Sequence, residues 1–204
     1  MTFSTDLTKP LSRAGLAINL VVLTALFYVL SAASYHYMTE TLPHQGAAHQ
    51  TAELAAQTAE KTFEKAKKAA KGKAFDESAA QAQAKAAGEA EAKKKAEEIH
   101  HHAVEGWAPF AVFLLILSAV FFAGFLSVAV QRRANDAGLL GLWLFPNHLG
   151  AWLFAGFVAF YPFLSAHGLR NAWTPAFIAG LVLLLPALLS GEGKGEIHHG
   201  HDHH

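Results

Sequence analysis

Histidine is the residue whose chemistry and number stand out in this chain. There are 13 histidines among 204 residues, and neutral imidazole is a common ligand for zinc, copper and nickel. The candidate metal ligands form two groups, a run in the middle of the chain and a C-terminal tail: His100, His101, His102, His198, His199, His201, His203 and His204. His36 and His44 could converge on the first group. We therefore expect a divalent-metal site as one alternative.

The other alternative is that these histidines are solvated or lie at lipid headgroups and hold no metal. Among the mid-chain histidines, no helical His-x-x-x-His pair and no His-Glu-x-x-His motif fixes a coordination geometry. The five tail histidines surround Asp202, and such a strand binds divalent metals in bulk without forming a defined site. His148 stands alone, and we expect it to hydrogen-bond with Asn147, the alternative being a proton or cofactor ligand.

Composition and charge exclude several classes of function. The chain has no cysteine, which excludes disulfides, thiolate metal sites and cysteine nucleophiles. Its 16 basic and 16 acidic residues give a formal net charge of zero, so nothing favours nucleic-acid binding. We expect no required cofactor.

Apolar residues are concentrated in blocks. The helices that these blocks form must position any polar site. The first of four blocks is long enough to cross a hydrocarbon core of about 30 Å, and all four are plausible membrane spans. The predicted transmembrane helices are Gly15 to Tyr37, Trp107 to Val130, Leu139 to Leu164 and Trp173 to Leu189. The first block could also be a signal peptide, but its length and its ending in Tyr35, His36 and Tyr37 favour a retained helix.

An insertion rich in Ala, Lys, Glu and Gln separates the first two spans. These four residue types are strong helix formers, and the segment from Gly72 to Ser78 is the best candidate for a break near its middle. The expected structure is an antiparallel helical hairpin over residues 39–105. Its alanine core is weak, so a partly disordered, charge-rich spacer is the alternative.

The short loops predict the orientation in the membrane. Lys9 and Arg13 precede the first span, while Arg132 and Arg133 lie between the second and third. Positive residues near span ends favour the cytoplasmic side. We therefore expect cytoplasmic N- and C-termini, with the hairpin on the opposite side.

A short motif occupies the loop between the second and third spans. Its residues are Arg132, Arg133, Asp136, Gly138, Gly141 and Trp143. We expect the two arginines to anchor a helix end at phosphate headgroups, and Asp136 to pair with one of them or to cap the next helix. Gly138 suits a tight turn, and Trp143 suits the membrane interface. This interpretation requires no catalysis.

The motif resembles the signature of the bacterial inner-membrane family named domain of unknown function 805. That family carries an Arg-Arg-x-x-Asp-x-Gly-x-x-Gly-x-Trp stretch between two hydrophobic spans. Leu139 and Leu140 depart from its usual pattern, and the Ala-rich insertion is not typical of it. The resemblance implies a bacterial inner (cytoplasmic) membrane location and lends no activity.

The prediction for the whole chain is an all-α membrane protein with four transmembrane helices and an extramembrane Ala-rich hairpin between the first and second. Its regions are 1–38 (cytoplasmic N-terminus and first span), 39–105 (hairpin), 106–190 (spans two to four) and 191–204 (His-rich tail). The spans carry too few polar groups for an enzyme or a transport pathway. We expect a non-catalytic accessory subunit that contacts membrane lipids and binds other membrane subunits or itself, the alternative being a membrane metal-handling protein.

Overall fold

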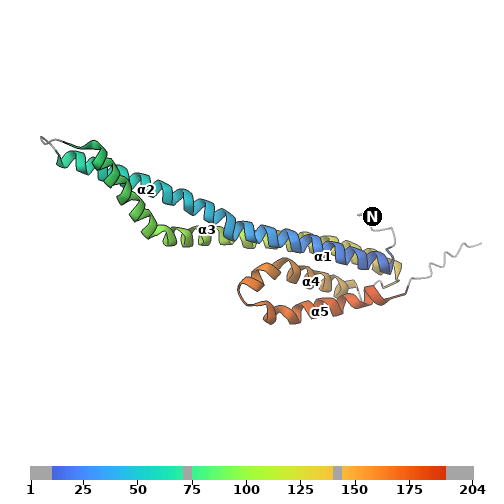
Figure 1. The fold of residues 1–204 in the computed structure, drawn as a ribbon. Helices are drawn as coiled ribbons and strands as arrows, with labels where there is room; N and C mark the ends of the chain where they lie inside the picture. Colours follow the sequence, from blue (N-terminus) through green and yellow to red (C-terminus); the bar gives the residue numbers. More distant parts are fainter. Residues whose placement is uncertain (1–10, 71–74, 140–143, 192–204) are drawn as a thin grey trace, which may run out of the picture. The chain divides into compact units, whose positions relative to one another are not determined.

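The computed structural model describes residues 11–70, 75–139 and 144–191, and these residues are in helices and short turns. The elements are α1 (Arg13–His36), the π-helical turn η1 (Tyr37–Thr41), α2 (Leu42–Ala69), α3 (Glu77–Asp136), α4 (Leu144–Ala166) and α5 (Arg170–Leu189) (Figure 1). Four helical stretches are long and apolar enough to cross a membrane: the continuous run Arg13–Ala69, then α3, α4 and α5. The prediction of an all-helical protein with four candidate membrane spans is confirmed.

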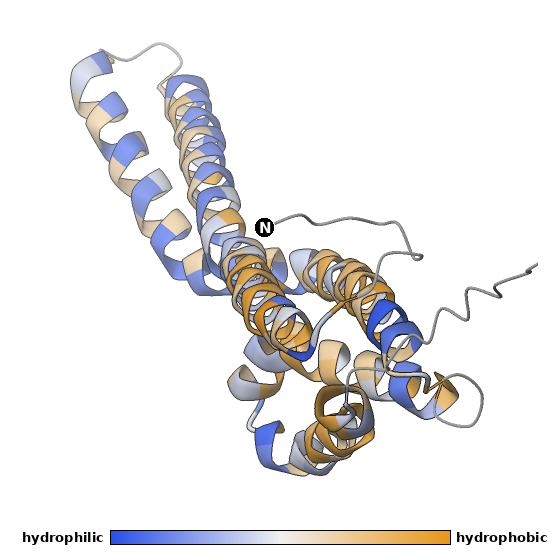
Figure 2. Ribbon diagram, turned by 90° about the vertical axis from the view of Figure 1, so that its right-hand side faces the viewer, coloured by the Kyte–Doolittle hydropathy of each residue, from blue (hydrophilic) through white to orange (hydrophobic). Residues whose placement is uncertain are grey.

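The chain divides into two compact units. One contains Met1–Ala33 and Leu114–His204, and we call it the apolar unit. The other contains Ser34–Phe113, and we call it the polar unit. Figure 2 shows the difference in composition, since hydrophilic residues recur along α2 and the first part of α3 while hydrophobic residues dominate α4 and α5. Each unit has its own internal packing.

A series of aromatic contacts joins all four helices of the apolar unit. Phe27 of α1 stacks on Phe122 of α3 with ring centroids 5.0 Å apart, and Phe122 meets Phe154 of α4 edge-on at 6.0 Å. Phe154 in turn stacks on Phe177 of α5 at 5.4 Å. Aromatic pairs in these geometries each contribute about 0.5–1.5 kcal/mol beyond their burial. The core of the bundle is therefore built around phenylalanine.

Small residues let α4 and α5 approach closely. A Cβ added at Gly150 would lie 2.9 Å from the backbone oxygen of Gly180, and one added at Gly180 would lie 2.9 Å from the backbone nitrogen of Phe154. Such glycine contacts are typical of helix pairs in membranes. Gly150 therefore packs within this chain.

Two helices of the apolar unit end in the same way, at a glycine. Gly138 after α3 has φ +67°, and Gly168 after α4 has φ +68°. Directly after Gly138, the Leu139 N–H donates to the carbonyl of Ala134 at 2.9 Å. This is a Schellman motif, in which a left-handed residue terminates the helix. Leu139, the predicted start of the third span, lies in this terminating turn and is not helical; the described part of α4 is Leu144–Ala166.

Alanine and glycine contacts hold α2 against the first part of α3 in the polar unit. A Cβ at Gly88 would lie 2.3 Å from the carbonyl oxygen of Ala55, so the two backbones nearly touch there. Ala47, Ala84 and Ala92 are buried. Phe63 and Phe75 are in contact near the end of α2, with centroids 6.0 Å apart.

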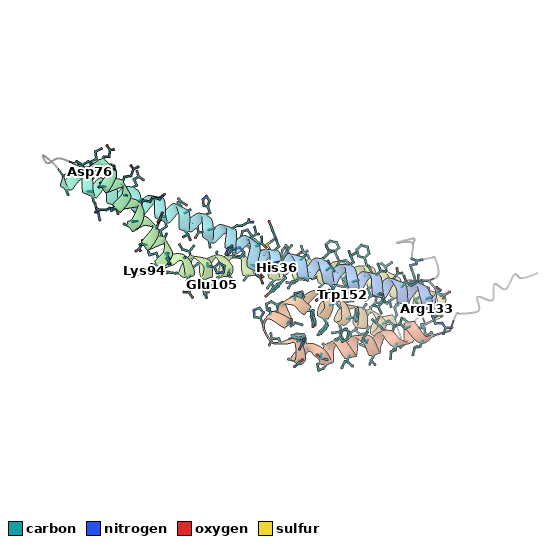
Figure 3. The ribbon with its side chains drawn as sticks, viewed as in Figure 1. His36, Asp76, Lys94, Glu105, Arg133 and Trp152 are labelled. Carbon is teal, nitrogen blue, oxygen red and sulfur yellow. The ribbon has the colours of Figure 1, made fainter. Side chains whose placement is uncertain are left out.

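The break between α2 and α3 falls where the sequence predicts it. Helix α2 ends at Ala69, and α3 begins at Glu77. Asp76, labelled in Figure 3, accepts hydrogen bonds from the Ala79 backbone N–H at 3.0 Å and from the Ser78 hydroxyl at 2.9 Å. An aspartate in this position is a strong helix start signal. Gly72 itself lies outside the described residues.

Candidate functional site

The arginine motif forms a buried clamp in the apolar unit. Arg133, near the end of α3, is 0% exposed (Figure 3). Its Nε donates to the carbonyl of Ala187 at 3.1 Å, and its Nη2 donates to the carbonyls of Ser190 and, at 3.2 Å, Gly191. Its Nη1 pairs with the Asp136 carboxylate. One guanidinium therefore binds one carboxylate and three backbone carbonyls.

The carbonyl partners of Arg133 explain why a charge is tolerated there. The last carbonyls of a helix have no partner within that helix, and the dipole of the helix makes this end negative. Arginine presents several donors in a rigid plane that can satisfy them together. The clamp thus fastens the C-terminal end of α5 to the end of α3.

This geometry corrects one prediction and confirms another. Arg133 is not a headgroup anchor, because its side chain is fully buried, and Arg132 is only 8% exposed. The pairing of Asp136 with an arginine is confirmed, and so is the turn at Gly138. Gly141 and Trp143 lie outside the described residues.

A polar chain lies beside the clamp. His148 Nε2 is 3.1 Å from Gln131 Oε1, and Gln131 Nε2 donates to Asn135 Oδ1 at 2.9 Å. The predicted pairing of His148 with Asn147 is therefore wrong. Asn147 is fully buried, and neither atom of its amide has a hydrogen-bond partner within the described residues.

An aromatic groove of about 410 Å³ lies between α4 and α5. Trp152, labelled in Figure 3, and Trp173 are both exposed at its edges. Gly156 is part of the lining, and a Cβ added there would meet nothing within 4 Å. The full lining is Trp152, Leu153, Gly156, Phe157, Phe160, Phe163, Leu164, Leu169, Trp173 and Ala176. The groove is apolar and has space for a further side chain.

The polar unit brings together only some of the predicted metal ligands. His100 meets His44 with ring centroids 5.9 Å apart, and the two line one pocket together with His36 and Glu40. His101 and His102 instead pair with Glu105, at 3.5 and 3.4 Å. The tail histidines His198, His199, His201, His203 and His204 lie outside the described residues.

Glu40 is the member of this cluster that the sequence reasoning missed. Its Oε2 lies 3.0 Å from His36 Nδ1, and it stands four residues from both His36 and His44. A search for His-x-x-x-His pairs passes over this spacing because a glutamate occupies the middle position. The sequence pattern that indicates this cluster is His-x-x-x-Glu-x-x-x-His, from His36 to His44.

Comparison with known proteins gives no relative from which a function could be carried over. No protein-family model matches the chain, no curated protein matches it, and no solved structure matches it. The class that fold and sequence define is an all-helical protein with four candidate membrane spans.

Proposed function

We propose that this chain is a non-catalytic accessory subunit of a larger bacterial inner-membrane complex, and that a transmembrane helix of a partner occupies the aromatic groove between α4 and α5. The observation that carries the proposal is the groove itself. It combines exposed tryptophans with a glycine that leaves space at Gly156. Helices in lipid associate through close packing at small residues, since no hydrophobic force drives them together there.

The polar unit supports the same proposal. Its α2 and α3 segments form the hairpin of our proposal, and both line an open, largely apolar groove of about 510 Å³. Six alanines contribute to the lining, together with His44, Thr51, Glu89, Lys93 and His100. Alanine buries little area compared with the roughly 1.5–3 kcal/mol gained on burying a leucine or phenylalanine. A partner surface that covers these arms would add the missing burial. In this proposal the hairpin lies outside the cytoplasm, and both termini lie inside.

The arginine motif fits a structural role in this proposal. The clamp fixes the relative positions of α3 and α5 through backbone carbonyls and leaves the Arg133 guanidinium no exposed surface for a substrate. The resemblance of this segment to the family of domain of unknown function 805 would then reflect a shared way of closing a helical bundle.

Co-purification from native membranes tests the proposal. The chain is extracted in mild detergent through a histidine-free tag, and co-migrating proteins are identified by mass spectrometry. We expect a stoichiometric set of membrane subunits with the parent chain and its loss with Gly156→Leu, which fills the groove. Gly124→Leu is the matched control, because Gly124 also has nothing within 4 Å of an added Cβ and lies on α3.

Two outcomes would contradict the proposal. Migration of the parent chain alone or as a homo-oligomer would exclude a heteromeric complex. Equal retention of partners by Gly156→Leu and Gly124→Leu would exclude the groove as the docking surface.

A further inference from the structure

The histidine pocket of the polar unit indicates a function in addition to the accessory role. We propose that His36, Glu40, His44 and His100 bind one divalent transition-metal ion with the ligand preference of zinc. Three imidazoles and one carboxylate are ligands that zinc takes, in a tetrahedral arrangement. The four side chains line a single pocket of about 520 Å³.

The π-helical turn η1 explains why residues eight positions apart share this pocket. In a regular α-helix eight residues turn through about 800°, which leaves His36 and His44 about 80° apart. In η1 the Leu42 N–H donates to the Tyr37 carbonyl five residues back. One wide turn takes up about one extra residue, so the two histidines fall within about 20° of each other. Single π turns often occur at functional sites.

Two ligands of the proposed site are already close together. His36 Nδ1 and Glu40 Oε2 are 3.0 Å apart, close to the separation of about 3.3 Å that two ligand atoms have on a tetrahedral zinc with bonds of about 2.0 Å. Their side chains are 65% and 69% exposed, so an ion from solution reaches them. In the absence of metal this contact is a histidine–carboxylate pair.

His44 and His100 supply the opposite side of the site, from α2 and α3. Their rings are 5.9 Å apart and nearly perpendicular. Both are exposed, and rotation of exposed side chains takes only picoseconds to nanoseconds. Metal binding therefore requires these two rings to turn toward the His36–Glu40 pair across the pocket that all four residues line.

A second cluster competes with this assignment. His101, His102 and Glu105 place three ligand atoms within 4.8 Å of one another. However, all three are exposed residues of one stretch of α3, and both histidines share the same carboxylate. The three ligands of that cluster come from α3 alone, whereas the proposed site draws ligands from more than one helix around a pocket.

Zinc binding by the full-length chain tests the proposal. The five tail histidines are replaced by asparagine to remove bulk binding, and the chain carries no histidine tag. Zinc is measured by equilibrium dialysis, and cobalt substitution reports tetrahedral geometry by its visible absorption. We expect one zinc per chain, and an affinity at least about tenfold lower for His44→Ala, His100→Ala and Glu40→Gln, because even loss of groups that only support a ligand costs 10–100-fold.

Matched variants separate this site from its neighbours. His49→Ala removes an exposed histidine of α2 outside the pocket, and a His101→Ala/His102→Ala double variant removes the competing cluster; both should bind zinc like the parent. Helix content by circular dichroism confirms that each variant folds. The proposal is overturned by the absence of stoichiometric zinc, by unchanged affinity in His44→Ala and His100→Ala, or by loss of binding in the double variant.

Discussion

At the scale of single residues, Arg133 shows how a charge can be fully buried in an apolar unit. Its partners are one carboxylate and three main-chain carbonyls, and each accepts a hydrogen bond from the guanidinium. Neither lipid nor an alanine side chain could donate these hydrogen bonds in its place. Removing one member of a buried ion pair typically costs about 3–5 kcal/mol, because the remaining group is left uncompensated. Arginine itself, and not merely a positively charged residue, is therefore needed at this position.

Arg133→Ala should accordingly lower the free energy of unfolding by about 3–5 kcal/mol. Arg133→Lys should recover only part of this loss, since one ammonium group cannot reproduce the planar array of donors. Denaturant unfolding in detergent, followed by circular dichroism, measures both. Arg170→Ala is the control because Arg170 is exposed at the start of α5, and an equal effect of that variant would contradict the clamp.

Asp76 makes a second prediction, which concerns pH. The hydrogen bonds from the Ala79 N–H and the Ser78 hydroxyl hold the pKa of the Asp76 carboxyl below its usual value. Its support for the start of α3 is therefore complete above the pKa of an unfolded aspartate, about 3.9, and disappears as the pH falls through the lower pKa of the folded state. Hydrogen exchange at the Ala79 amide, corrected for its intrinsic rate, should show this loss. Asp76→Asn should remove most of the pH dependence, and an unchanged profile in that variant would show that another group is responsible.

At the scale of helices, the composition of the sequence predicts which segments form helices better than it predicts where each helix begins and ends. The first span was predicted from Gly15 to Tyr37; α1 begins nearby at Arg13, but the helical run continues through η1 and α2 to Ala69. The predicted third span starts at Leu139 because the apolar residues that follow Gly138 hide the turn at that glycine. That predicted start therefore lies in a turn and not in a helix.

The candidate sites were harder to predict because they depend on residues distant in sequence. The carbonyl acceptors of Arg133 lie 54 to 58 residues further along the chain, so no local sequence pattern predicts them. The π turn likewise leaves no clear mark in the sequence, although it decides that His36 and His44 share a face. The histidines themselves were evident, and their partner Glu40 was not.

Gly88 makes a prediction about helix contact. Gly88→Ala would place a methyl group 2.3 Å from the Ala55 carbonyl oxygen, and a backbone atom cannot move aside without separating the helices. We expect a loss of about 1–3 kcal/mol, as for other overpacked positions. Thermal unfolding of the polar unit by circular dichroism measures it.

Gly46→Ala is the matched control, with the opposite sign expected. A Cβ at Gly46 meets nothing within 4 Å, so the alanine should stabilise α2 by about 0.5–1 kcal/mol through its better helix propensity. Destabilisation by both variants would mean that the Gly88 contact is not what limits the helix pair.

At the scale of the whole molecule, the absence of cysteine makes the proposed orientation directly measurable. Single cysteines can be introduced without background labelling. On intact spheroplasts, a membrane-impermeant maleimide should label Gln83→Cys and Asn171→Cys, whereas Ala14→Cys should react only after permeabilisation. All three positions are exposed. The reverse pattern would show that the positive-residue rule misassigns this chain.

The Arg133 clamp also imposes an order on biosynthesis. A ribosome makes Arg133 and Asp136 before it makes Ala187, Ser190 and Gly191, so among the described acceptors only the Asp136 carboxylate is available to the nascent arginine. An unpaired guanidinium in or near lipid is costly. Until the end of α5 has been made, Asp136 is therefore the one described acceptor that can pair with Arg133, and the three carbonyl contacts can form only after α5 is complete.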